Sequence, residues 1–210
     1  GSALVLGNNL ELGSFGQGAL DISAGGRVDC ASGLLNGGQA GGSNSSSVYG
    51  ANSFWLTRRG LVVGDDFGLT ILNLGDGGRV EVQGIAMAVG ARAGSEGRIE
   101  VDGGASPAPS ALDTRLVLEA GIGVGGKGVV RVRNKGRFLS GKLTVGVDAG
   151  SEGTLEVIGS GTSLTAGDTL EIGRAGGGRL TIFSGGVATA PDVLIGSNPG
   201  TNPLRLTGTA

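Results

Sequence analysis

The residues of this chain that most directly suggest chemistry are two carboxylate pairs. Asp65 and Asp66 lie in the segment GDDFG, and Asp168 lies three residues before Glu171. Paired carboxylates can cleave polysaccharides by acid–base catalysis, and acidic turns can bind calcium. Neither pair has a complementary group at the matching place in a neighbouring repeat, and the chain has no His for a catalytic triad. We therefore expect no enzyme and no bound metal, and we interpret Asp65 and Asp66 as residues that cap backbone N–H groups at a corner.

A glycine motif, the net charge and the length of the apolar runs bear on three further classes of function. Residues 121–126 match the dinucleotide pattern G-x-G-x-x-G, but the segment KGVVRV that follows has the alternation of a strand. A strand offers no helix N-terminus to hold a pyrophosphate, so we expect no cofactor. The net charge of -2 argues against a nucleic-acid partner. No apolar run approaches the ~18 residues of a membrane helix, so we expect no membrane insertion by this segment.

A basic segment spans residues 127–142, with no acidic residue between Glu119 and Asp148. Such a segment could bind an anionic glycan or polymer. The alternative is a solvated face that Glu100, Glu152 and Glu156 neutralise from adjacent repeats. The candidate ligand contacts within the segment are Lys127, Arg131, Arg133, Lys135 and Arg137.

A second candidate contact region combines aromatic and basic residues. Exposed aromatic rings beside Arg are typical of carbohydrate and protein contacts. The alternative is that these bulky side chains cap the core near the N-terminal end of the fold. The candidate residues are Tyr49, Phe54, Trp55, Arg58 and Arg59.

The elements that must position these residues are short alternating segments, each ending at Gly. The copies are LELG (10–13), LVVG (61–64), MAVG (87–90), AGIG (120–123), LTVG (143–146), LEIG (170–173) and VLIG (193–196). After each Gly comes a second alternating segment of one of two classes, such as ILNLGDGGRV and GSEGTLEVIGSGTS. The classes alternate, and AGSEG at 93–97 accordingly recurs 56 residues later at 149–153.

Strands this short cannot form a stable hairpin alone, but like strands stacked coil upon coil pair along their whole length. No window shows the apolar stripe of a helix. The sequence therefore predicts an all-β fold, a right-handed parallel β-helix (β-solenoid) of about eight coils in two-coil repeats. We expect residues 1–210 to form one continuous domain, with Cys30, the single Cys, as a buried hydrophobic residue.

The coil alignment makes a specific prediction about outward-facing residues. Glu100, Arg131 and Glu156 should lie on successive coils and form an acid–base–acid ladder, each exposed pair contributing ~0–1 kcal/mol. The complete outward series, in coil order, is Asp21, Ser47, Asn73, Glu100, Arg131, Glu156, Thr181 and Arg205.

The stretch from Leu143 to Val187, with AGSEGTLEVIGSGTSLT and DTLEIGRAGGGRLTIFSGGV, resembles the repeat of autotransporter (type V secretion) passengers and PEP-CTERM-associated surface proteins. The resemblance implies an extracellular segment of a longer passenger, exported to the bacterial cell surface. It also implies a structural or adhesive role, with a surface glycan or protein, or a second copy, as partner. A polysaccharide-cleaving or glycan-binding β-helix is the alternative. The insertion at 106–115 and the basic segment depart from the family pattern.

Overall fold

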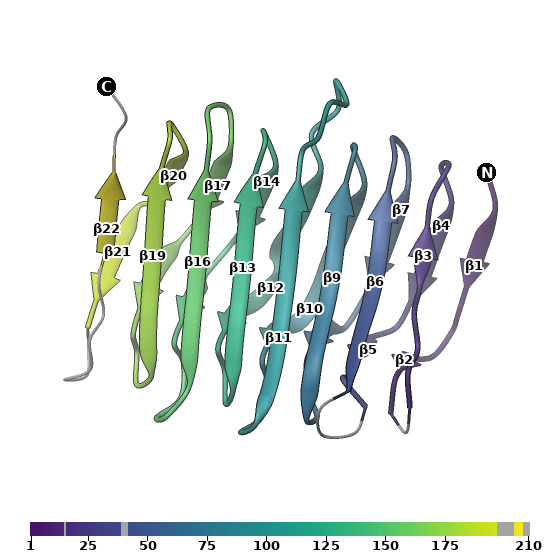
Figure 1. Cartoon of the computed structure of the whole chain (residues 1–210), viewed down its shortest axis with the longest axis horizontal. Coiled ribbons are helices and arrows are strands. Elements are labelled where there is room, and N and C mark those ends of the chain that lie inside the picture. The colour runs from purple at the N-terminus through teal and green to yellow at the C-terminus, as the bar shows by residue number, and fades with distance from the viewer. Residues whose placement is uncertain (15, 39–41, 197–203, 208–210) are drawn as a thin grey trace.

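The structure, a computed structural model, describes residues 1–14, 16–38, 42–196 and 204–207. Every regular element in this part of the chain is a β-strand, and every ladder between strands is parallel. Figure 1 shows the chain advancing from one end of a rod to the other, with each turn passing once across the front and returning behind. The winding is right-handed, so the predicted right-handed parallel β-helix is confirmed.

The front of the rod in Figure 1 is one eight-stranded sheet, to which each coil contributes one strand. The two sequence classes occupy this same sheet on alternate coils, which explains the two-coil repeat. Its strands are β3 (Asp21–Ile22), β6 (Ser43–Tyr49), β9 (Gly68–Gly75), β11 (Ser95–Asp102), β13 (Lys127–Arg133), β16 (Glu152–Ile158), β19 (Gly177–Phe183) and β22 (Leu204–Thr207).

The back of the rod is a second sheet in which two rows of strands meet at a corner. The first row holds β1 (Ala3–Val5), β4 (Arg27–Cys30), β7 (Phe54–Thr57), β14 (Arg137–Ser140), β17 (Ser163–Ala166) and β20 (Val187–Thr189). The second row holds β2 (Leu10–Leu12), β5 (Gly33–Leu35), β8 (Gly60–Val63), β15 (Leu143–Val145), β18 (Thr169–Ile172) and β21 (Asp192–Ile195). In the middle of the rod, β10 (Arg79–Val89) and β12 (Ala111–Ile122) run through the corner and belong to both rows.

The register of the front sheet matches the alignment made from the sequence. Each member of the predicted series from Asp21 to Thr181 is paired with the next member, and the last of these pairings joins Thr181 to Arg205. These pairings make about seven complete turns, slightly fewer than the eight coils expected. The step between paired residues is largest from Glu100 to Arg131, because the loop at 103–110 projects between β11 and β12 at the top of Figure 1.

The inward side chains form one continuous apolar core along the rod. Columns of Leu, Val and Ile from the three strand rows are almost completely buried. Burying each such side chain contributes roughly 1.5–3 kcal/mol before conformational entropy is subtracted. The two large aromatic members are Trp55 and Phe138, both fully buried. Cys30 is also fully buried as predicted, and burial raises the pKa of its thiol.

Two columns of glycine allow the second row and the front sheet to meet closely. The Gly that ends each segment found in the sequence adopts a positive φ, between 66° and 79°. A second column, Gly97, Gly128, Gly153 and Gly178, lies in register in the front sheet. A Cβ on any of these four would collide with backbone atoms of a neighbouring corner. The repeated AGSEG thus ends on Gly97 and Gly153 because the backbones of adjacent coils leave no room there for a side chain.

Candidate functional site

The aromatic and basic residues at 49–59 do not form one exposed contact surface. Trp55 lies in the core, where its Nε1–H points to the Cys30 sulfur at 3.4 Å, so the packing alternative holds for this residue. Tyr49 is 42% exposed, and its ring lies over the backbone of Gly75 in the next coil. The remaining candidates, Phe54, Arg58 and Arg59, lie on the outer surface.

The outward side chain of Phe54 is held between two guanidinium groups. Arg27 lies 4.7 Å and Arg79 5.8 Å from the centre of its ring, on the coils before and after. Arg58 is engaged as well, because its Nε and Nη2 donate to the two carboxylate oxygens of Asp29 at 2.9 and 2.6 Å. These hydrogen bonds from Arg58 lower the pKa of Asp29 against the opposing effect of burial. Phe54 and Arg58 are therefore already partnered within the rod.

The basic segment is largely neutralised by carboxylates of adjacent coils. The predicted ladder is confirmed, since Arg131 reaches Glu100 at 3.2 Å and Glu156 at 2.5 Å. Hydrogen bonding to Glu156 raises the pKa of Arg131. Two further pairs connect Lys127 with Glu96 at 3.4 Å and Arg133 with Asp102 at 3.0 Å.

Lys135 and Arg137 are different from the other cations of the segment. Both side chains are exposed, and neither belongs to an ion pair within the described ranges. Lys135 also has a φ of 68°, in the left-handed region that costs a side-chain-bearing residue about 1 kcal/mol. The equivalent corners of other coils carry Gly25, Gly77 and Gly185 at this position, each with positive φ.

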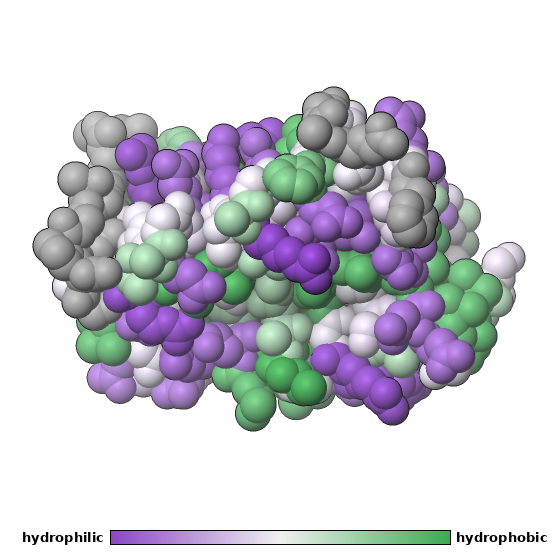
Figure 2. Space-filling model, turned by 90° about the horizontal axis from the view of Figure 1, so that it is seen from below, coloured by the Kyte–Doolittle hydropathy of each residue, from purple (hydrophilic) through white to green (hydrophobic). Residues whose placement is uncertain are grey.

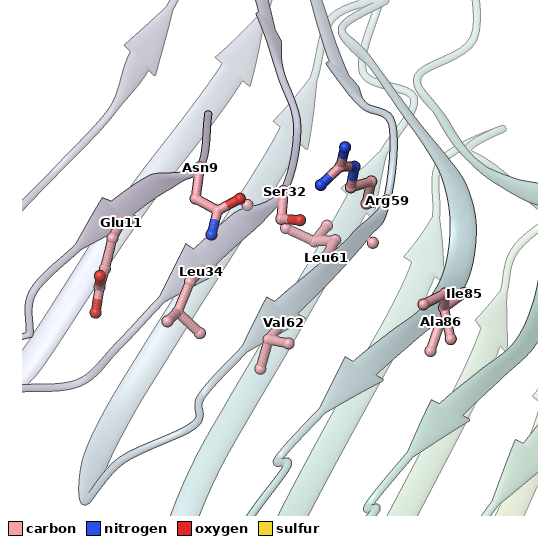
Figure 3. Close-up of a pocket in the computed structure, with 11 residues that line it drawn as sticks. Asn9, Glu11, Ser32, Leu34, Arg59, Leu61, Val62, Ile85 and Ala86 are labelled. Atoms are coloured by element: carbon pink, nitrogen blue, oxygen red, sulfur yellow. The ribbon is translucent and has the colours of Figure 1, made fainter. Parts of the chain in front are cut away.

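Arg59 is the candidate residue that lies in a hollow of the surface. The groove has a volume of about 280 Å³ and runs across the corner between the two back rows. Figure 3 shows Asn9, Ser32 and Arg59 along one side and Leu34 and Val62 along the other. Ile85 and Ala86 stand at one end, and Glu11 at the opposite end. Among the described residues, Arg59 has no ion-pair partner, so its guanidinium is available to a ligand.

The groove residues other than Arg59 were not identified from the sequence. The sequence signal for the groove is the number of residues in the corner between the two back rows. On three successive coils this corner comprises residues 31–32, 58–60 and 83–86, so it lengthens by one residue per coil. The added residues of the third coil raise Ile85 above the surface, where its side chain is 70% exposed. A short corner beside a long one produces the hollow.

The carboxylate pairs considered for catalysis or calcium binding lie apart from this groove. Asp65 and Asp66 face Arg92 at 3.1 and 3.9 Å, so a guanidinium occupies the place a cation would take. Burial raises the pKa of Asp65. Asp168 accepts a hydrogen bond from Thr169, and Glu171 is 9% exposed. Within the described ranges, no three His, Cys, Asp or Glu side chains gather closely enough to hold a metal ion, and no helix is long and apolar enough to cross a membrane.

The ionisation of Asp113 is expected to make the stability of the rod depend on pH. Burial alone would raise the pKa of this carboxylate, but two hydrogen bonds from Arg115, at 3.0 and 2.7 Å, and the charge of Arg79 outweigh it and lower the pKa. A lowered pKa stabilises the fold above the unfolded value of about 3.9, and this contribution is lost as the pH falls through the folded value.

Asp113→Asn is therefore expected to lower the free energy of unfolding by about 1–2 kcal/mol at pH 7. It should also flatten the loss of stability between pH 5 and pH 2, because the titrating carboxylate is gone. Urea unfolding at several pH values measures both effects. A variant curve parallel to that of the wild type would contradict the assignment.

Comparison of the chain with models of protein families, with curated proteins and with solved structures finds no match.

Proposed function

We propose that this chain is a segment of a bacterial cell-surface passenger of the autotransporter type, and that it presents a rigid rod for adhesion or aggregation. Its partner would be an acidic glycan or polymer, contacted by Lys135 and Arg137. The proposal is supported by the resemblance of the repeat to such passengers, by the stacked coils and by the surface charges. Figure 2 shows hydrophilic and hydrophobic residues intermixed over one long face, as suits a rod whose sides meet water.

The observation that best supports this contact site is the left-handed backbone conformation of Lys135. A residue held at φ 68° costs stability that Gly in the same corner avoids. Lys135 nevertheless stands there with an exposed ammonium group, two residues before the exposed Arg137, and its stem lies over Gly161 of the next coil. A strained residue kept at the surface is typical of a position selected for binding.

Lys135→Gly is expected to raise the free energy of unfolding by about 0.5–1 kcal/mol, because it relieves the left-handed backbone. The same change should weaken binding to immobilised alginate severalfold, since one ionic contact is lost. Asn52→Gly is the matched control, because Asn52 stands at the same position in the corner of an earlier coil, has the same φ of 68° and carries no charge. It should stabilise the rod and leave binding unchanged.

Two measurements test whether Lys135 and Arg137 form the contact site. Urea unfolding reports the gain in stability, and surface plasmon resonance compares alginate with neutral dextran at low salt. Alginate binding that survives Lys135→Gly and Arg137→Gln together, or that is no stronger than dextran binding, would refute the contact site.

A further inference from the structure

The groove beside Arg59 has the shape of a binding site for a small extended ligand. It runs from β2 through β5 and β8 to the wall at Ile85 in β10, which is three strand spacings or about 14 Å. Its volume of about 280 Å³ is close to the lower limit for small-molecule pockets.

The two sides of the groove differ in chemistry. Asn9, Ser32 and Arg59 offer an amide, a hydroxyl and an unpaired guanidinium along one side. A guanidinium binds carboxylate oxygens through two parallel N–H groups, so this side favours an anionic head group. Leu34 and Val62 form the other side and are partly exposed, so an apolar body would remove them from water.

The charge at the two ends of the groove sets the polarity of the ligand. Arg59 lies toward the wall formed by Ile85, whereas Glu11 lies two coils away at the opposite end. The Glu11 carboxylate accepts a hydrogen bond from Ser14 and stays beside the groove. A second negative charge at that end of a ligand would be repelled.

We propose that this groove binds a medium-chain aliphatic carboxylate, with its head group at Arg59, Ser32 and Asn9. The hydrocarbon chain runs from the head group over Val62 and Leu34 toward Glu11, and Ile85 closes the end of the groove beside Arg59. This site is independent of the glycan contact proposed for Lys135 and Arg137, because those residues lie on other coils and line none of it. Failure of either proposal leaves the other standing.

The test is a titration of the isotopically labelled chain, followed by NMR of the backbone amides of Ser32, Gly33 and Gly60 and of the methyl groups of Leu34, Val62 and Ile85. Octanoate is expected to shift these signals with a Kd on the order of 1 mM, as its size allows. Octylammonium, which has the same chain and the opposite charge, should bind at least tenfold more weakly. Suberate, which adds a second carboxylate, should bind roughly fivefold more weakly than octanoate because of Glu11.

Variants separate the site from general attraction of anions. Arg59→Gln should weaken octanoate binding roughly tenfold or more, the loss expected for a charged hydrogen-bond partner. Arg179→Gln is the matched control, since it removes an exposed arginine in β19 that has no ion pair among the described residues, and it should leave the affinity unchanged. Ile85→Ser should also weaken binding without affecting the fold, because this side chain is exposed.

Three results would overturn the proposal. The first is octanoate-induced shifts that avoid the groove residues, or no shifts at 10 mM octanoate. The second is equal binding of octanoate and octylammonium, which would show apolar contact alone. The third is an equal effect of Arg59→Gln and Arg179→Gln, which would show attraction by net charge.

Discussion

Trp55→Ala is expected to lower the free energy of unfolding by about 3–5 kcal/mol, the usual cost of truncating a large buried aromatic side chain. The indole is fully buried and donates toward the Cys30 sulfur. It also fills the space beside Gly33, where a Cβ would lie only 2.7 Å from the indole atom Cζ2. No neighbouring side chain replaces this volume, so the truncation leaves a cavity.

The neighbouring aromatic residue provides the control. Phe54→Ala removes a surface ring that contacts two arginines, and it should cost only about 1 kcal/mol. Urea unfolding followed by circular dichroism measures both variants. A change below 1 kcal/mol for Trp55→Ala would contradict the placement of this residue in the core and return it to the candidate contacts.

Gly128→Ala is the second change with a large expected effect, a loss of roughly 3 kcal/mol or failure to fold. Gly128 lies in the middle of the rod, where a Cβ would collide with the carbonyl oxygen of Val89 and the backbone nitrogen of Gly123. These are backbone atoms of the hydrogen-bonded corners, so they cannot move aside as a flexible side chain would.

Gly177→Ala distinguishes this collision from a general effect of replacing glycine in a strand. Gly177 lies in β19 and has no positive φ, and its Cβ would meet only the Ser151 carbonyl oxygen, at 3.6 Å. Its replacement should change the free energy of unfolding by less than about 0.5 kcal/mol. Equal stabilities of the two variants would show that the glycine column is not a close contact between coils.

The register could be predicted from the sequence because the spacing of apolar residues and glycines repeats in every coil. Asp21 through Arg205 were aligned correctly despite steps of different length, since the inward pairs on either side of each outward residue fix its phase. The ion pairs of Arg131 followed directly from that alignment.

The second-row strand β5 could not be recognised in the sequence as a copy of the Gly-ended segment, and the reason lies in the packing of Trp55. The strand Gly33–Leu35 has Gly where the other copies have an apolar or small inward residue, because the indole fills that place. Asn36 then stands where the other copies end in Gly. Two departures in four residues concealed the repeat, and the spatial cause is visible only in the folded coil.

The candidate site was predicted less well than the fold. Residue type alone could not separate Trp55, which is buried, from Arg59, which lines a groove, or from Arg58, which is bound to Asp29. The groove depends on differences in corner length between β8 and β10, and β10 continues as one strand through its corner at Gly84, so no break in the strand marks the end of the first row.

The ion-pair ladder, the groove and the rod all depend on the parallel stacking of coils, and one NMR measurement tests this stacking directly. In parallel coils, the backbone protons of Arg131 should show NOEs to residues near Glu100 and near Glu156, which are 31 and 25 positions away in the sequence. We expect both sets of NOEs in the isotopically labelled chain. NOEs connecting β13 instead to β12 or β14 as an antiparallel hairpin would contradict the parallel β-helix, and with it the ladder, the groove and the rod.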